Sequence, residues 1–187
     1  MKITLATKIT ILRILILPFL IVSLINQKSG MALFLFVLAG VTDGLDGFIA
    51  RKLNQRSDLG MVLDPLADKF LVNSTFILLT FSSLEFVNRV PLYLGLTVLI
   101  RDASLLLGAL LIKISFGKKR FFPSILGKIS TSSQILTLFL VLLGNHFQQN
   151  FGYLRYLFLI TFIFTLISGL DYFYKSFISL VKTSSAG

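Results

Sequence analysis

Acidic residues are crowded into one short part of this chain. The sequence has 187 residues and eight Asp or Glu, and five of these acids fall between positions 43 and 68. Asp43 is followed three residues later by Asp46, and Asp64 is followed four residues later by Asp68. Both spacings correspond to about one helical turn, so each pair is expected to lie on one face of a helix. Four carboxylates brought together in this way could bind divalent cations and support phosphoryl chemistry.

The composition around these acids is that of a membrane protein. Hydrophobic residues make up 55% of the chain and the mean hydropathy is +0.88, which indicates a polytopic membrane protein. Residues 1–187 are expected to form a single membrane domain. The absence of cysteine excludes disulfides, thiol catalysis and Cys-based metal sites. The net charge of +10 is attributed to membrane topology and anionic lipid headgroups, with no nucleic-acid partner.

Six apolar segments predict an all-α fold with six transmembrane helices. They cover residues 9–25, 31–50, 59–81, 91–112, 129–143 and 154–174. Most of them have about 20 residues, enough to cross ~30 Å of hydrocarbon. The fifth segment is shorter, so its helix is expected to begin inside the preceding basic loop, and residues from Lys175 onward are expected to form a tail.

Lysine and arginine are distributed unevenly between the two sides of such a bundle. One side holds Lys2, Lys8, Arg51, Lys52, Arg56, Lys113, Lys118, Lys119, Arg120, Lys128, Lys175 and Lys182, and the other holds Lys28, Arg89 and Arg155. The positive-inside rule then places both termini and the basic loops in the cytoplasm. We therefore expect a multi-pass protein of a cell inner (cytoplasmic) membrane with its active site facing the cytoplasm.

The second and third spans are expected to form an antiparallel hairpin around the basic loop at residues 51–57. Helical rise from this loop places Asp43 and Asp46 about 12 and 8 Å into the membrane, and Asp64 and Asp68 about 10 and 16 Å. Glycines in both spans permit close helix approach. The four carboxylates can therefore converge on one small volume.

Such a cluster would keep several of its protons unless cations neutralised it. Carboxylate oxygens suit Mg2+, Mn2+ or Ca2+, and two Mg2+-like ions could clamp a phosphoryl group during displacement. Arg51 at the mouth would be a bidentate phosphate ligand. The alternatives are a proton or cation relay in a transporter, or carboxylates that pair with intramembrane Arg13, Lys69 and Arg101.

Three segments carry a resemblance to a known family. The motif Asp43-x2-Asp46-Gly47-x2-Ala50-Arg51-x8-Gly60-x3-Asp64-x3-Asp68 resembles the signature of the CDP-alcohol phosphatidyltransferase family, with every defining position filled. Thr10-x2-Arg13 with Pro18 resembles the start of the family's first helix. Leu126-Gly127-Lys128-x2-Thr131-x2-Gln134 resembles a segment of the bacterial members that make phosphatidylglycerophosphate. Two departures from those members are Ala6-Thr7 in place of Pro-Asn and Arg101-Asp102 in place of Arg-Glu; Arg-Asp also occurs in the family's cardiolipin synthases.

The resemblance implies an enzyme that transfers the phosphatidyl group of CDP-diacylglycerol to an alcohol and releases CMP. It implies that Asp43, Asp46, Asp64 and Asp68 hold two ions, Mg2+ or Mn2+, and that Asp68 is the general base. It also implies that Gly47, Ala50, Arg51 and Gly60 cradle the CDP-lipid. The family suggests a homodimer.

The acceptor alcohol is expected to be anionic, with glycerol 3-phosphate as the substrate. Arg101 lies in mid-span, and its neighbour Asp102 is expected to point about 100° away, leaving the guanidinium to bind the acceptor phosphate. Lys128 and Arg120 are expected to complete this pocket. Within the family the rival acceptor is phosphatidylglycerol, and outside it the rival function is cation-coupled transport.

Overall fold

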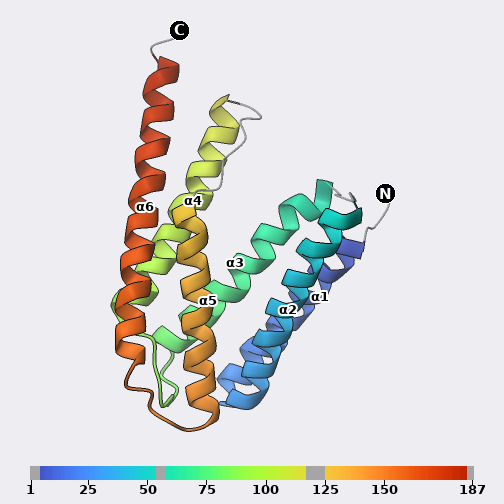
Figure 1. The fold of residues 1–187 in the computed structure, drawn as a ribbon, viewed down its shortest axis with the longest axis vertical. Coiled ribbons are helices and arrows are strands. Elements are labelled where there is room, and N and C mark those ends of the chain that lie inside the picture. Colours follow the sequence, from blue (N-terminus) through green and yellow to red (C-terminus); the bar gives the residue numbers. More distant parts are fainter. Residues whose placement is uncertain (1–4, 54–57, 117–124, 185–187) are drawn as a thin grey trace. The chain divides into compact units, whose positions relative to one another are not determined.

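The computed structural model describes the backbone of residues 5–53, 58–116 and 125–184, and the side chains of residues 11–42, 44, 69–108 and 125–174. Over this described backbone the chain is helical, with six helices (Figure 1). They are α1 (Leu5–Ile25), α2 (Ser29–Leu53), α3 (Asp58–Phe81), α4 (Leu92–Phe116), α5 (Ile125–His146) and α6 (Leu154–Ser184). The all-α prediction and the order of its helices are confirmed, whereas six membrane spans with cytoplasmic termini remain a prediction.

Two helix boundaries test the predictions for the second half of the chain. Helix α5 begins at Ile125, inside the predicted basic loop, as expected from the shortness of the fifth apolar segment. Helix α6 continues to Ser184, so the segment expected to follow the sixth span as a tail is helical up to this residue. Residues 175–184 contain neither Gly nor Pro, and so nothing in the local sequence ends the helix after Tyr174.

Helical length and apolar composition mark two membrane-capable helices within the described residues. These are Ile125–His146 and Leu154–Tyr174. Shorter apolar stretches cover Ile11–Ile25, Ser29–Thr42 and Lys69–Phe81. Each of these stretches is part of a longer helix among α1, α2 and α3.

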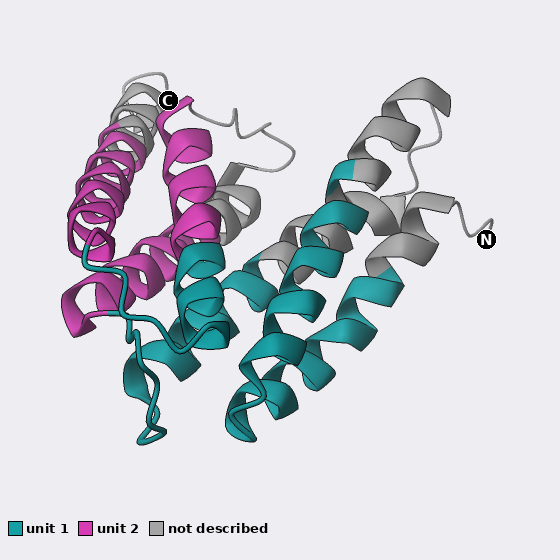
Figure 2. Ribbon diagram, turned by 60° about the horizontal axis from the view of Figure 1, so that its bottom comes forward, with its two compact units in different colours: residues 1–90, 138–152 teal, residues 91–137, 153–187 magenta. Residues whose placement is uncertain are grey.

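The chain divides into two compact units, which are coloured separately in Figure 2. Unit 1 comprises residues 1–90 and 138–152, and in it α1 packs against both α2 and α3. Ile16, Leu20 and Leu24 form the buried face of α1. On other faces, Phe19 is 66% exposed and Val22 is 53% exposed. A helix that is apolar all round, with large apolar side chains outside, is suited to a lipid environment.

Two helices in unit 1 end in the same type of turn. Gln27 and Gln148 have φ angles of 55° and 53°, in the left-handed region. After α5, the Gln148 N–H donates to the Asn145 carbonyl at 3.4 Å, and the Gln149 N–H donates to the Gly144 carbonyl at 2.9 Å. This is the Schellman pattern, and the same pair of bonds surrounds Gln27.

An amide clamp joins the α3–α4 connection to the end of α5. The Asn88 backbone N–H donates to Asn145 Oδ1 at 2.7 Å, and Asn145 Nδ2 donates to the Asn88 carbonyl at 3.0 Å. Asn88 Nδ2 in turn donates to the Gln149 carbonyl at 2.7 Å. Both asparagines are buried, and these bonds satisfy their polar groups. Gly144 lies against this clamp, where an added Cβ would be 2.6 Å from Asn88 Nδ2.

Unit 2 comprises residues 91–137 and 153–187, and in it α4 packs against α6. Leu94 and Val98 of α4 are fully buried, and Phe158 of α6 is nearly so. Tyr93 meets Phe162 edge to face, with ring centroids 5.2 Å apart. This apolar layer brings the middle of α4, which carries Arg101, against the middle of α6.

Candidate active site

The backbone places the acidic motif on two helices of unit 1. Asp43 and Asp46 lie on α2, and Asp64 and Asp68 lie on α3, each pair about one turn apart. Because α1 packs against both α2 and α3, it is the element that holds the two acidic helices in one unit. The predicted helical placement of the four aspartates is therefore confirmed at the level of the backbone.

The side chains of the predicted catalytic and CDP-lipid-binding residues lie outside the described side chains. These residues are Asp43, Asp46, Gly47, Ala50, Arg51, Gly60, Asp64 and Asp68. Arg120 lies in the segment 117–124, outside the described residues altogether. The convergence of the four carboxylates and the roles assigned to these residues stay predictions.

The chemistry of the donor set fits hard divalent cations. All four motif residues are aspartates, and the chain has no cysteine. His146, the single histidine, lies at the end of α5 against Gly30, near the start of α2. Asp43 is 13 residues further along α2 than Gly30, or about 20 Å at helical rise. Among the described side chains, no three His, Cys, Asp or Glu residues lie close enough together to hold a metal ion.

Arg13 is a further candidate residue of the active site, and the acidic motif alone does not indicate it. It is 2% exposed on α1, the helix that packs against α2 and α3. Arg13 precedes Ile25, the end of α1, by about 18 Å of helix, and Thr42 follows Ser29, the start of α2, by about 20 Å. In the α1–α2 hairpin the backbone of Arg13 is therefore at about the same level as Thr42, the residue before the acidic motif.

Helix α2 is regular up to the start of this motif. The Thr42 hydroxyl donates to the carbonyl oxygens of Leu38 at 2.9 Å and Ala39 at 2.8 Å, four and three residues earlier on the same helix. Its polar group is thereby satisfied within the helix, as apolar surroundings require. This supports the reading of Asp43 and Asp46 as one face of a continuous helix.

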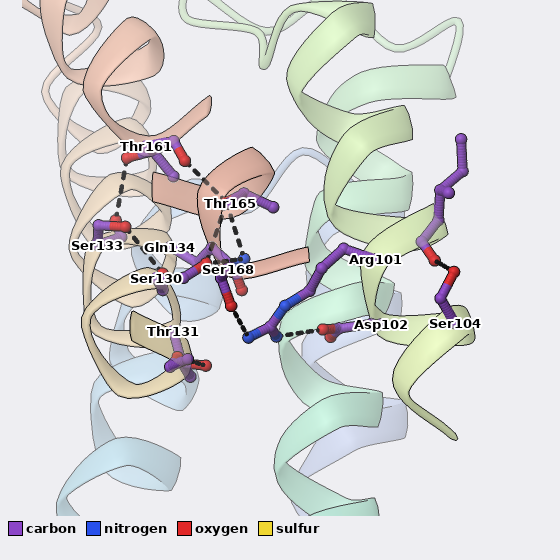
Figure 3. Close-up of polar contacts among 12 residues, drawn as sticks. Arg101, Asp102, Ser104, Ser130, Thr131, Ser133, Gln134, Thr161, Thr165 and Ser168 are labelled. Atoms are coloured by element: carbon purple, nitrogen blue, oxygen red, sulfur yellow. Dashed lines mark hydrogen bonds and ion pairs between the residues drawn. The ribbon is translucent and has the colours of Figure 1, made fainter. Parts of the chain in front are cut away.

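Arg101 has well-defined partners in unit 2 (Figure 3). It is 6% exposed, its Nη1 donates to Asp102 Oδ1 at 2.7 Å, and its Nη2 donates to Ser168 Oγ at 2.8 Å. The guanidinium carbon lies 5.8 Å from the centroid of the Tyr172 ring. Contacts from two helices, α4 and α6, thus orient a buried cation.

The expectation that Asp102 points away from Arg101 is wrong. Adjacent Cα–Cβ bonds on a helix do diverge by about 100°, but an arginine side chain is long enough to curl back to its neighbour. Burial favours this contact, because Asp102 is 2% exposed and an isolated carboxylate there would be costly. The ion pair satisfies part of the guanidinium, and Arg101 Nε has no hydrogen-bond partner among the described residues.

The other two predicted acceptor ligands are placed differently or not described. Lys128 lies near the start of α5 and is exposed, whereas Arg101 is buried and held by partners on α4 and α6. Arg120 is outside the described residues. Their joint binding of an acceptor phosphate stays a prediction.

The segment from Leu126 to Gln134 has a packing role that its resemblance to the family does not indicate. Gln134 is 1% exposed, and its Nε2 donates to Ser130 Oγ and to Thr165 Oγ1, both at 3.2 Å. Thr131 donates to the carbonyl of Gly127 at 3.0 Å within α5. Gln134 therefore fastens α5 to α6, and the polar spacing in α5 was the signal that could have indicated an interhelical contact.

The helical fold and the acidic motif define a class of membrane lipid enzymes. The chain matches the model of the CDP-alcohol phosphatidyltransferase family over residues 3–167. It belongs to this family and is a transferase of phospholipid biosynthesis. The family is membrane-associated and generally depends on a divalent metal.

Similar curated proteins carry two names within this family. The chain is 34% identical over 173 residues to the CDP-diacylglycerol–glycerol-3-phosphate 3-phosphatidyltransferase of Aquifex aeolicus, covering 91% of this chain and 94% of that protein. It is 35% identical to the enzyme of the same name from Bacillus subtilis, covering 81% and 75%. It is 32% identical to human cardiolipin synthase (CMP-forming), covering 71% of this chain and 48% of the human protein.

Proposed function

We propose that the chain transfers the phosphatidyl group of CDP-diacylglycerol to glycerol 3-phosphate, giving phosphatidylglycerophosphate and CMP. The observation that carries this proposal is the complete acidic motif on α2 and α3, two helices that α1 holds in one unit. The Aquifex and Bacillus relatives, whose names state this reaction, support the choice of acceptor. The enzyme works as a six-span protein of the cell inner membrane, with its active site facing the cytoplasm.

Different residues of the chain have different roles in the displacement. Asp68 accepts the proton of the attacking hydroxyl while the hydroxyl oxygen forms a bond to the phosphorus that carries diacylglycerol. The bond from this phosphorus to the bridging oxygen breaks, and CMP leaves with the electron pair. Gly47, Ala50, Arg51 and Gly60 hold the CDP-lipid. Mg2+ or Mn2+ held by Asp43, Asp46, Asp64 and Asp68 would polarise the pyrophosphate and neutralise the charge on the departing CMP.

Acceptor recognition is assigned to cations outside the acidic motif. Arg101 is proposed to bind the phosphate of glycerol 3-phosphate together with Lys128 and Arg120. The support comes from the burial of Arg101 and from the fixed orientation of its guanidinium, which leaves Nε without a hydrogen bond among the described residues. A buried guanidinium with a free N–H is suited to a phosphate oxygen.

One observation favours a second acceptor. Arg101-Asp102 follows the Arg-Asp pattern of cardiolipin synthases, and the human relative carries that name. The second candidate function is therefore transfer to phosphatidylglycerol, giving cardiolipin.

The test is CMP release by the purified protein. Full-length protein in detergent is incubated with CDP-diacylglycerol, Mg2+ or Mn2+, and either glycerol 3-phosphate, phosphatidylglycerol, glycerol or serine, and the lipid product is identified by mass spectrometry. Release with glycerol 3-phosphate supports the proposal. Release with phosphatidylglycerol alone replaces it with the second candidate, and the absence of release with every acceptor refutes both. Chelation with EDTA and the Asp68→Asn variant are the controls for background hydrolysis.

A further inference from the structure

A stripe of hydroxyl side chains runs along α6, the helix that carries no family motif. Thr161, Thr165 and Ser168 are spaced by four and three residues, so they share one helix face, and all three are fully buried. On other faces of α6, Ile163 is 51% exposed and Leu170 is 70% exposed. Buried hydroxyls on a helix suited to lipid need hydrogen-bond partners, either on their own helix, as the Thr161 carbonyl is for Thr165 at 2.7 Å, or on neighbouring helices.

The first two members of the stripe bind α5. Thr161 Oγ1 is 2.8 Å from Thr137 Oγ1. Thr165 Oγ1 accepts hydrogen bonds from Ser130 Oγ and Gln134 Nε2, both at 3.2 Å (Figure 3). These bonds join neutral groups and set the register of α6 against α5. They account for Thr161 and Thr165 as packing residues.

Ser168 differs because its partner is a charged group on α4. Its Oγ accepts from Arg101 Nη2 at 2.8 Å, while Asp102 holds Nη1 at 2.7 Å. Asp102 is on the same helix as Arg101, so this ion pair alone does not fix the guanidinium relative to α6. Among the hydrogen bonds of the described residues, the Ser168 bond ties the guanidinium to a second helix, one turn before Tyr172, whose ring lies 5.8 Å from it.

We infer that Ser168 is a positioning residue that sets the orientation of the Arg101 guanidinium for binding an anionic phosphate group. The bond to Ser168 leaves Arg101 Nε available, since it has no described hydrogen-bond partner. Helix α6 thereby acts on acceptor recognition through Arg101 without touching the acceptor. This inference rests on the proposed function in assigning Arg101 to the acceptor phosphate.

A purely structural role for Ser168 makes a different prediction. If the Ser168 hydroxyl only supports helix packing, then its removal should resemble the removal of the Thr137 hydroxyl, which also lies in the buried α5–α6 contact. Thr137→Val keeps the side-chain volume and removes one interhelical hydrogen bond that does not involve Arg101. Ser104→Ala is a second control, because Ser104 is exposed on α4 and donates to the carbonyl of Ile100 on its own helix at 2.7 Å.

The experiment measures CMP release with varied glycerol 3-phosphate at saturating CDP-diacylglycerol. It then measures CMP release with varied CDP-diacylglycerol at saturating glycerol 3-phosphate. For Ser168→Ala we expect the KM for glycerol 3-phosphate to rise about five- to tenfold, because a hydrogen bond to a charged group is lost. The kcat and the KM for CDP-diacylglycerol should stay within about twofold of wild type. Thr137→Val and Ser104→Ala should leave all three constants within the same range. An unchanged KM for glycerol 3-phosphate in Ser168→Ala, or an equal rise in Thr137→Val, overturns the inference.

A second measurement separates this inference from the proposed function. The thermal midpoint of each purified protein is recorded with and without inorganic phosphate or glycerol 3-phosphate. We expect the anions to stabilise wild type and Thr137→Val more than Ser168→Ala. If wild type releases no CMP with any acceptor, then the proposed function fails and this comparison alone decides the role of Ser168. The inference about Ser168 is overturned if the anions stabilise all three proteins equally, or stabilise none of them.

Discussion

The amide clamp between Asn88 and Asn145 gives a sharp prediction for stability. Asn145 is 1% exposed and supplies both an acceptor to the Asn88 N–H at 2.7 Å and a donor to the Asn88 carbonyl at 3.0 Å. Asn145→Ala removes both, leaving two buried backbone groups of Asn88 without these partners. Each buried group left unsatisfied costs about 1–3 kcal/mol. We expect the free energy of unfolding to fall by about 3 kcal/mol, or the thermal midpoint by about 6–12 °C for a chain of this length.

The assay is thermal unfolding in detergent, followed by circular dichroism at 222 nm, because the chain has no Trp and no Cys for fluorescence or thiol labelling. Asn150→Ala is the control, since Asn150 is an exposed asparagine in the connection after α5. Asn145→Asp should be no more stable than Asn145→Ala, because it replaces the donor to the Asn88 carbonyl with an acceptor. A midpoint for Asn145→Ala within about 2 °C of the Asn150→Ala value would refute the reasoning, since two unsatisfied groups should cost more than this.

Four further substitutions have expected outcomes. Gly144→Ala should lower the thermal midpoint by several degrees, because an added Cβ would lie 2.6 Å from Asn88 Nδ2. Gln148→Gly should stabilise the protein by up to about 1 kcal/mol in the same assay, because Gln148 has a φ of 53°. Asp68→Asn should lower the rate of CMP release at least ~100-fold while CDP-diacylglycerol binding is retained. Asp43→Asn should in addition raise the Mg2+ concentration needed for half-maximal activity.

Each of these expectations has an outcome that contradicts it. Wild-type stability of Gly144→Ala would mean that Asn88 can move away at little cost. A Gln148→Gly variant less stable than wild type would show that the glutamine side chain contributes more than the left-handed backbone costs. Activity retained by Asp68→Asn would remove Asp68 as the general base, and an unchanged Mg2+ requirement for Asp43→Asn would remove Asp43 from the metal site.

Most of the helical fold could be predicted from the sequence. Apolar segments of about 20 residues form helices in a lipid environment because each backbone group must be satisfied within its own segment. The same reasoning predicted the early start of α5, since a segment ending at Leu143 was too short. It did not predict how far α6 extends, because the expected tail began where the apolar segment ends, whereas the helix continues to Ser184 through residues without Gly or Pro.

The surroundings of Arg101 show why the candidate site was less predictable. The position of Arg101 in mid-span indicated a special role, and its burial agrees with that indication. Helical geometry predicted that Asp102 would point elsewhere, but the reach of a long side chain and the cost of a buried carboxylate bring the two together. Ser168 lies 67 residues away on a helix without a recognised motif, and local spacing says nothing about contacts at that distance.

By itself, the sequence determined the class of this protein, the order of its helices and its family. These properties depend on local composition and on the fixed spacing of the acidic motif. Both can be read from the sequence without knowing how the chain folds. The tertiary structure decided the partners: Asp102 and Ser168 for Arg101, Thr165 for Gln134, and Asn145 for Asn88. Such pairs depend on which helix faces meet and on how far each side chain reaches. Both are set by packing between segments that are distant in the sequence.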